Sequence, residues 1–317
     1  MDTKQLRYFS AVYERRNLSH AAQGCNVAQS AISHHLSNLE AELGVKLFER
    51  LPRGMEPTAA ASRLYEHAQT ILRGLKAARE DVVQMADELI GEIHVGLPFT
   101  VIEAIGVQLM QEMQAEHGRA KIIIHEALTS ELIRQLLSGQ HDLVLCYNPP
   151  ANERLKLSFV HEEEMYCAGL PKFLGGSCDP IEFEDALALP QIMLRRGEAS
   201  RSLSTQPRLL ESLYESAVFE LNSTNLVRKA VAAGIGVAVT SFVAMRDLVG
   251  AGTIVARPLT NPRVTRGLHV ARLADRLPTR LMETVQSRTL RLIAAEVSSG
   301  RWPTVNSASN RVEAQSL

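Results

Sequence analysis

An apolar seam of unusual length runs through residues 58–89 and sets the first limit on how this chain can fold. Apolar side chains follow one another there in alternating steps of four and three residues: Leu64, Ala68, Ile71, Leu75, Ala78, Val82, Met85 and Leu89. Such steps keep all of these side chains on one side of a single α-helix. Thr58 is a suitable cap for this helix, and Pro57 requires an extended backbone just before it.

We expect residues 59–90 to form a linker helix that pairs with the same helix of a second copy. A long helix with one apolar seam usually needs a partner helix to cover that seam. The residues expected at the dimer seam are Leu64, Ala68, Ile71, Leu75, Ala78 and Val82. The alternative is that the helix packs against its own domain.

Residues 1–58 show a pattern that predicts three short helices followed by a hairpin. In the stretch "NVAQSAISHHLSNLEAELG" the residues Ile32, Leu36, Leu39 and Leu43 recur at helical spacing, and Gly44 is a natural end for that helix. Ser19 offers a cap for the preceding helix. The segment "VKLFERLPRGMEPT" then has the Pro and Gly residues of a turn between two short strands.

This order of elements predicts a winged helix-turn-helix, whose third helix inserts its first residues into the major groove of DNA. The side chain of Gln29 can pair with adenine, and serine hydroxyls can bond to bases or phosphates. The candidate DNA-binding residues are Gln29, Ser30, Ser33 and His34 on the helix and Arg50 and Arg53 on the wing. Residues 1–58 contain seven Lys and Arg against six Asp and Glu, a net charge of +1, so local clustering and doubling in a dimer must supply the attraction.

From Gly91 onwards predicted strands alternate with predicted helices, which is typical of an α/β domain with parallel sheets. We expect this domain at residues 91–300. Its first lobe is expected at about 91–163 and 268–298, and its second lobe at about 164–267. The Ser- and Asn-rich residues 301–317 predict a disordered tail.

Composition excludes several classes of protein. The chain has 317 residues, of which 45% are hydrophobic and 22% are charged, and its net charge is −1, so it is neither disordered overall nor strongly basic. Charges interrupt the N-terminal residues and no apolar run is long enough to cross a bilayer, so we expect a cytoplasmic protein without a membrane span. The four cysteines are scattered and are expected to be reduced thiols.

No motif for a cofactor or for catalysis is present, so neither an enzyme nor a bound cofactor is expected. The chain has no G-x-S-x-G elbow, no Walker loop and no complete dinucleotide fingerprint. A metal site at His94, His125 and His269 is conceivable, but histidines satisfied within a sheet are the preferred interpretation. Cys146 is either a redox sensor or, by preference, a buried inert thiol.

These segments together resemble LysR-type transcriptional regulators. The matching motifs are "QLRYF" in the first helix, "SHAA" in the second, "VAQSAIS" entering the third, "LEAELGVKLFER" at its end and "RGMEPT" at the wing. The later "AVAAGIGVAVTS" also resembles a helix and strand of that family, so the resemblance covers about residues 1–297. Two positions depart from the family's pattern: His34-His35 stand where Arg-Gln is frequent, and Ala61 stands where glycine is frequent.

The resemblance implies a winged helix-turn-helix head, a linker helix and two α/β lobes like those of periplasmic binding proteins. It places a small-molecule effector between the lobes, near Phe99, Thr100, Thr129, Tyr147, Arg195, Arg196, Arg201, Asn222 and Thr240. The three arginines suit a carboxylate or another anion, although they are equally consistent with solvated or interface side chains. Thr100 and Thr129 are also consistent with helix caps.

The sequence therefore predicts a homodimeric or homotetrameric regulator that binds double-stranded promoter DNA and responds to an anionic effector. RNA polymerase is a further partner that the resemblance allows. A solute-binding protein would lack the DNA-binding head, and an α/β enzyme would need a catalytic motif. A regulator that works without an effector stays open.

Overall fold

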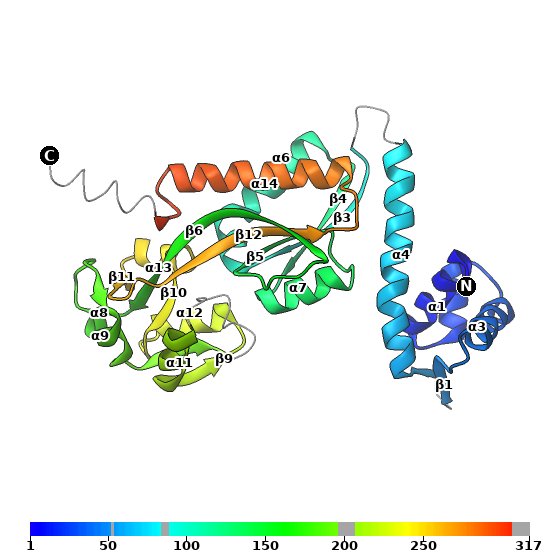
Figure 1. Cartoon of the computed structure of the whole chain (residues 1–317), viewed down its shortest axis with the longest axis horizontal. Coiled ribbons are helices and arrows are strands. Elements are labelled where there is room, and N and C mark those ends of the chain that lie inside the picture. The colour runs from blue at the N-terminus through cyan, green and yellow to red at the C-terminus, as the bar shows by residue number, and fades with distance from the viewer. Residues whose placement is uncertain (52–53, 84–88, 196–206, 306–317) are drawn as a thin grey trace. The chain divides into compact units, whose positions relative to one another are not determined.

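The structure of the chain, a computed structural model, describes residues 1–51, 54–83, 89–195 and 207–305 (Figure 1). Contacts between residues divide the chain into two compact units. The first comprises Met1–Gly91 together with Ser138–Gln140, and the second comprises the rest. We call the first unit the head and the second the α/β domain.

The head contains three short helices, a hairpin and one longer helix. These are α1 (Thr3–Arg15), α2 (Leu18–Cys25), α3 (Gln29–Leu43), β1 (Phe48–Leu51), β2 (Gly54–Pro57) and α4 (Ala59–Val83). The side chain of Asn17 caps α2 by accepting the N–H groups of Ser19 and His20, so the cap predicted at Ser19 was wrong. α3 ends at Gly44 with φ of +67°, a left-handed conformation that glycine adopts without strain, as the sequence predicted.

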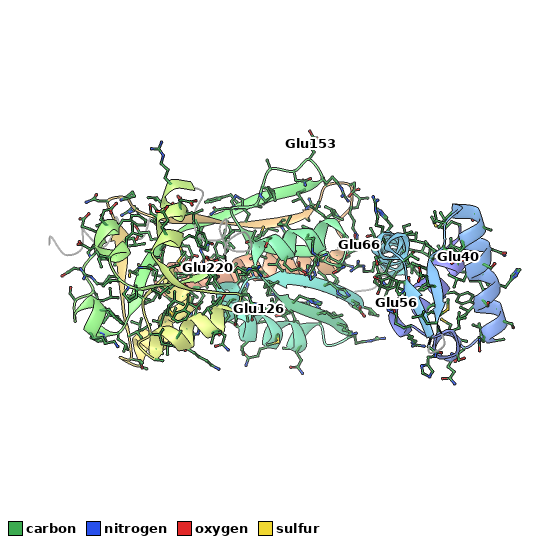
Figure 2. All side chains as sticks on the ribbon, turned by 90° about the horizontal axis from the view of Figure 1, so that it is seen from below. Glu40, Glu56, Glu66, Glu126, Glu153 and Glu220 are labelled. Atoms are coloured by element: carbon green, nitrogen blue, oxygen red, sulfur yellow. The ribbon has the colours of Figure 1, made fainter. Side chains whose placement is uncertain are left out.

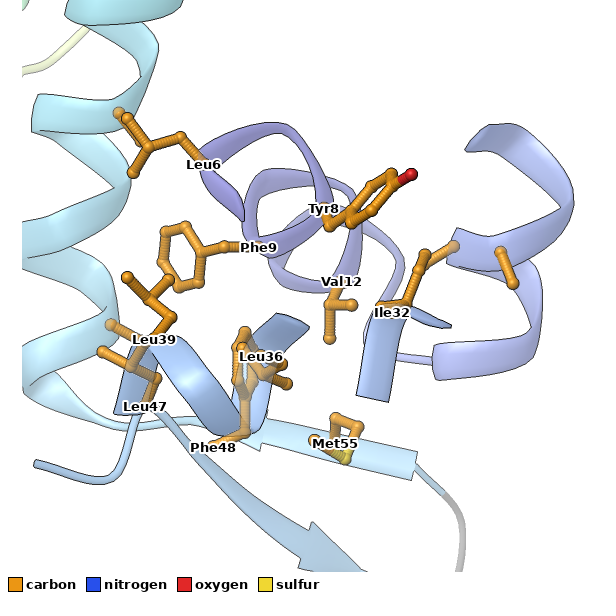
Figure 3. Close-up of a cluster of buried hydrophobic side chains, with 14 residues drawn as sticks. Leu6, Tyr8, Phe9, Val12, Ile32, Leu36, Leu39, Leu47, Phe48 and Met55 are labelled. Atoms are coloured by element: carbon orange, nitrogen blue, oxygen red, sulfur yellow. The ribbon is translucent and has the colours of Figure 1, made fainter. Parts of the chain in front are cut away.

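The core of the head lies between α1, α3 and the hairpin (Figure 3). Ile32, Leu36 and Leu39 form the buried face of α3, whereas Leu43 is 39% exposed and falls outside it. Phe9 of α1 packs against Phe48 at the base of the hairpin, with ring centroids 5.7 Å apart. Each fully buried aliphatic or aromatic side chain contributes about 1.5–3 kcal/mol, so this core fixes which face of α3 is left at the surface.

Glu40 ties α3 to the base of the hairpin (Figure 2). One carboxylate oxygen accepts the N–H groups of Leu47 at 2.8 Å and Phe48 at 3.3 Å, and the other accepts from Lys46 at 2.8 Å. Burial works to raise the pKa of Glu40, but Lys46 and the two N–H groups outweigh burial and lower it. The hairpin is therefore held in a fixed relation to the exposed face of α3.

The first half of α4 packs against the core of its own head. This agrees in part with the alternative interpretation of the seam, in which the helix packs against its own domain. Ala68 is fully buried and Leu64 is half-buried against the head core, and Tyr65 stacks on Tyr13 of α1 with ring centroids 4.1 Å apart. Ala68, which was predicted at a dimer seam, is part of the buried core of the head and is not accessible to a partner helix.

The second half of the predicted seam lies at the surface of the head. Ile71 is 43% exposed and Leu75 is 56% exposed, and Ala78 is exposed as well. The side chain of Val82 lies outside the described residues. Ile71, Leu75 and Ala78 are the seam residues that stay accessible to a partner helix.

The α/β domain is built on one mixed sheet. Its strands are β3 (Gly91–Leu97), β4 (Ala120–Glu126), β5 (Leu143–Tyr147), β6 (Leu155–Gly169), β7 (Ile181–Glu182), β10 (Ala238–Ser241), β11 (Val255–Thr260) and β12 (Thr265–Leu273), in the order β4-β3-β5-β12-β6-β11-β7 with β10 on β6. A separate parallel pair is formed by β8 (Gln191–Leu194) and β9 (Ala217–Leu221). β3 and β5 are parallel, but β12 runs antiparallel to β5 and β6, so the expectation of purely parallel sheets was wrong.

Two long strands, β6 and β12, connect the two lobes of this domain (Figure 1). β6 pairs with β12 up to Glu164 and then, from Met165, with β10 and β11. The first lobe has its own core around α7 and β5, and the second has its cores around β6, β10 and α12. The pairing partner of β6 thus changes at the point where the chain leaves one core for the other.

Helices cover both lobes. They are α5 (Phe99–Val101), the π-helical turn η1 (Ile102–Gly106), α6 (Val107–Glu116), α7 (Thr129–Leu137), α8 (Pro171–Leu174), α9 (Phe183–Leu187), α11 (Pro207–Glu215), α12 (Thr224–Ala232), α13 (Phe242–Gly250) and α14 (Arg280–Ser298). α7 packs on β5 and β12, and α14 packs on η1 and α6. None of the helices within the described ranges combines the length and apolar character that a membrane span needs.

The chain just after α14 is ordered, contrary to the prediction of a disordered tail over residues 301–317. Trp302 is fully buried and Thr304 is 7% exposed, while residues 306–317 lie outside the described residues. The Ser- and Asn-rich composition that motivated the prediction begins only after these residues. One buried indole was enough to dock Arg301–Thr304 on the domain.

Candidate DNA-binding surface and ligand pocket

The start of α3 presents a small polar surface. Gln29, Ser30 and His34 are exposed and Ser33 is half-buried, on the side of α3 opposite its apolar face. Ala28 precedes the helix and has no side-chain group that could cap it. The first backbone N–H groups of α3 are therefore not satisfied by a cap, which suits a phosphate at this helix end.

Neighbouring side chains hold two of these residues in place. The side-chain oxygen of Gln29 accepts the hydroxyl of Ser19 at 2.8 Å, and the imidazole of His34 lies 3.1 Å from the amide of Asn38. His35 is half-buried and packs edge-on against Tyr8, with ring centroids 5.2 Å apart. Of the histidine pair that departs from the family pattern, His34 is the exposed member.

The two wing arginines predicted to meet DNA are not described in full. Arg50 belongs to β1, opposite Met55 of β2, but its side chain lies outside the described residues, as does Arg53 entirely. The hairpin strand that carries Arg50 is fixed at its base to α3 through Glu40.

A cavity of about 50 Å³ lies in the α/β domain where the two lobes meet. Residues of the first lobe line one side and residues of the second lobe line the other. Five of the predicted effector-binding residues are among them: Phe99, Thr100, Thr129, Tyr147 and Thr240. The cavity is smaller than the ~300–1,000 Å³ of sites for drug-sized ligands, so it suits a small molecule unless the lobes move apart.

The other predicted effector residues are not brought into this cavity. Arg195 is exposed just after β8, where its N–H donates to the carbonyl of Leu221 at 2.7 Å, and Asn222 follows β9; neither lines the cavity. Arg196 and Arg201 lie outside the described residues.

Sequence reasoning missed Arg266, the one charged side chain among the described residues that line the cavity. It comes from β12 and is 7% exposed, and its Nε donates to Glu163 of β6 at 2.5 Å. Its guanidinium also lies over the ring of Tyr147, 3.6 Å from the centroid. An arginine among the apolar residues of a predicted strand, together with the acidic run at 162–164, was the signal for a buried ion pair.

Burial and charge act together on this group of side chains. Burial opposes the charged form of Arg266, but the carboxylate of Glu163 outweighs it and raises the pKa of the guanidinium. Burial, and then the charge of Glu163, raise the pKa of Tyr147 well above its usual range. The hydroxyls of Tyr147 and Thr100 lie 2.8 Å apart. The cavity wall therefore offers a permanent cation and neutral hydroxyls.

Both threonines with a possible capping role lie at this wall. The hydroxyl of Thr129, at the start of α7, accepts the backbone N–H of Tyr147 at 3.0 Å instead of a group of its own helix. Thr100 is 5% exposed at the start of α5. These contacts place the Tyr147 side chain beside the cavity.

The alternative metal and redox interpretations find no geometric support among the described residues. His94 and His125 stack with centroids 6.0 Å apart, but His269 packs instead against Phe159, and no group of three or more His, Cys, Asp and Glu in this part of the chain could hold a metal ion. Burial raises the pKa of Cys146 to about 12, which keeps this thiol protonated and unreactive.

A winged helix-turn-helix head joined to a two-lobed domain with a charged interlobe cavity defines a class of protein, the ligand-responsive DNA-binding regulators. Residues 3–62 match the model of bacterial regulatory helix-turn-helix proteins of the lysR family, and residues 86–290 match the model of the LysR substrate binding domain. The chain belongs to the LysR family of transcriptional regulators. The predictions of this fold class and of a regulator instead of an enzyme are thereby confirmed.

Two curated relatives are similar over most of their length. The chain is 29% identical over 270 residues to the nitrogen assimilation regulatory protein nac of Klebsiella aerogenes, a match that covers 84% of this chain and 87% of the relative. It is 28% identical over 266 residues to the DNA-binding transcriptional dual regulator OxyR of Escherichia coli K12, covering 84% and 87%.

Solved structures share the fold. A full-length variant of OxyR from Pseudomonas aeruginosa has a TM-score of 0.72 at 24% identity and covers 92% of this chain and 95% of its own. CbnR in complex with its target DNA has a TM-score of 0.64 at 20% identity and covers 94% and 100%.

Proposed function

We propose that this protein is a cytoplasmic, dimeric or tetrameric regulator that binds promoter DNA through the start of α3 and responds to a small carboxylate between its lobes. The exposed polar surface of α3, whose opposite face packs on the head core, supports the proposal of DNA binding. Arg266 at the cavity supports the proposal of a carboxylate effector. RNA polymerase is the partner through which occupancy of the promoter would change transcription.

The DNA-binding part is supported by chemistry as well as by position. Gln29 can offer a donor and an acceptor to one base, Ser30 and Ser33 can bond to bases or phosphates, and the uncapped helix start attracts a phosphate. Arg50 and Arg53 would meet the DNA backbone from the wing. Recovering the genomic fragments bound by the full-length protein and sequencing them tests this proposal and identifies the operator. Fragments without a shared motif would contradict it.

With that operator in hand, Gln29→Ala is expected to weaken specific binding by roughly tenfold to hundredfold, since one bidentate base contact is worth about 1–3 kcal/mol. Titrations at one fixed salt concentration, followed by fluorescence anisotropy, measure the change. Gln114→Ala removes the same side chain from an exposed position on α6 and should leave the affinity unchanged. Equal affinities for the wild type and Gln29→Ala would remove Gln29 from the site.

In the effector part of this proposal, Arg266 takes the place of the loop arginines (Arg195, Arg196 and Arg201) that the sequence predicted at the effector site. We expect small carboxylates to raise the melting temperature of the protein, because a ligand that binds only the folded state stabilises it. Arg266→Lys keeps the charge but loses the planar fork, so it should weaken carboxylate binding by about tenfold or more. Arg195→Ala is the matched control on the loop. Normal binding by Arg266→Lys with loss of binding by Arg195→Ala would return the site to the loop.

A further inference from the structure

The residues after α14 fold back onto the domain and insert one large side chain. Gly300 has φ of +73°, which reverses the chain, and the N–H of Trp302 donates to the carbonyl of Glu296 at 3.1 Å. The guanidinium of Arg301 holds the carboxylate of Glu296 with two hydrogen bonds of 2.7 and 3.0 Å. These contacts aim the indole of Trp302 inward.

The indole reaches the carboxylate of Glu163. Its Nε1–H donates to Oε2 of Glu163 at 2.6 Å, and its ring packs edge-on against His161 with centroids 4.8 Å apart. Trp302 is fully buried and Glu163 is 1% exposed. A hydrogen bond to a buried charge is short and strong, so this contact fixes both partners.

Glu163 is shared between both lobes and the C-terminal segment. Its Oε1 accepts from Arg266, and its Oε2 accepts from the hydroxyl of Ser241 at 2.9 Å as well as from Trp302. Ser241 ends β10 in the second lobe, whereas Trp302 follows α14 of the first lobe. The carboxylate thus lies where β6 passes from one lobe to the other.

The same carboxylate reaches the cavity wall. The guanidinium of Arg266, which donates to Glu163, lies 3.6 Å from the ring centroid of Tyr147, and the Tyr147 hydroxyl is 2.8 Å from that of Thr100. Arg266 and Tyr147 both line the cavity, and Arg266 connects this wall to Glu163. Only one side chain, Glu163, separates Trp302 from Arg266, the charged residue that would meet a ligand.

We propose that Trp302 is a positioning residue of the ligand pocket, which holds Glu163 in place so that Arg266 and Tyr147 present their polar groups to an anion between the lobes. This inference rests on the proposed function of the cavity. It follows that the C-terminal segment and the pocket are coupled: a change at the cavity wall alters the packing of Trp302, and a change at Trp302 alters the affinity of the pocket.

The chain itself provides the reporter, because Trp302 is its single tryptophan. In the full-length protein we expect Arg266→Lys, which keeps the charge but loses the planar fork that holds Glu163, to shift the Trp302 emission to longer wavelength and to increase its quenching by acrylamide. Arg263→Lys makes the same change at a neighbouring arginine that is 52% exposed and should leave both unchanged. Emission and quenching identical to wild type in Arg266→Lys would overturn the coupling, and this result does not depend on any ligand.

The second measurement uses sodium acetate as the probe, with sodium chloride at equal ionic strength as the control. We expect Trp302→Phe, which keeps an aromatic ring but loses the N–H donor, to raise the acetate concentration at half-maximal thermal stabilisation by about fivefold or more. A role in folding alone would lower the melting temperature without moving that midpoint, and would overturn the proposal. If acetate fails to stabilise even the wild type, the proposed anion site fails, whereas the fluorescence comparison still decides the coupling.

Discussion

Replacing Arg266 by methionine is expected to lower the free energy of unfolding of the α/β domain by about 3–5 kcal/mol, because it leaves the carboxylate of Glu163 buried without its counter-charge. Glu163 is 1% exposed and cannot turn to water without moving β6. The loss is a large fraction of the stability of a typical domain, which is about 5–15 kcal/mol in total. Urea unfolding followed by circular dichroism measures it.

A second variant separates the charge from the packing. Adding Glu163→Gln to Arg266→Met removes the unpaired charge, while the amide oxygen can still accept from Ser241 and Trp302. Because replacing both members of a buried pair is often close to neutral, the double variant should recover most of the lost stability.

The pair of Arg134 and Glu131 on α7 provides an exposed control. Its atoms lie 2.5 Å apart, and the two side chains are 55% and 41% exposed. Arg134→Met should therefore cost only about 0–1 kcal/mol. Equal costs for Arg134→Met and Arg266→Met would mean that burial of the Glu163 pair has no energetic consequence.

The head could be predicted closely from the sequence because local patterns determine it. The spacing of Ile32, Leu36 and Leu39 defines which face of α3 is buried, and the remaining face follows by exclusion. Gly44 marks the end of the helix by its own backbone preference. The cap of α2 is Asn17, whereas the sequence predicted Ser19. Both residue types cap helices, and only the tertiary structure decides which of the two does so.

The pocket could be predicted only in part, because its charged wall arises from a contact between distant residues. Phe99, Thr100, Thr129 and Tyr147 lie near the ends of strands, where α/β sheets place ligands, and this position is readable in the sequence. Arg266 and Glu163 are 103 residues apart and meet only because β6 and β12 pair antiparallel. The prediction relied instead on Arg195, Arg196 and Arg201, because arginines suit an anion.

Trp302 illustrates a different limit. Composition averaged over residues 301–317 predicts disorder, yet one aromatic side chain with a buried acceptor is enough to order the start of that segment. The heptad spacing likewise treated all seam positions of α4 alike, although Ala68 is buried in the head core and Ile71 and Leu75 lie at the surface. In both segments, the one after α14 and the seam of α4, the structure depends on whether one particular side chain packs against another part of the chain.

Ile71→Asp and Leu75→Asp are each expected to dissociate the dimer. The two side chains are 43% and 56% exposed in the single chain, and on one face of α4 they are the large apolar groups that a second α4 would cover. A carboxylate placed in such a seam would be buried without a partner, so the dimer dissociation constant should rise by about 100-fold or more. Sedimentation at micromolar concentration measures the mass of the variants.

The control for this experiment is Glu66→Lys, which changes an exposed charge on the opposite side of the same helix by the 3.6-residue helical repeat. It should sediment as the wild type does. In the proposed dimer two recognition helices contact one operator together, so the two Asp variants should also lose most of their operator affinity. The head should keep its fold, since neither position lies in the head core. An unchanged mass for both Asp variants would show that α4 does not pair through this face, and the dimer would then have to form through the α/β domain.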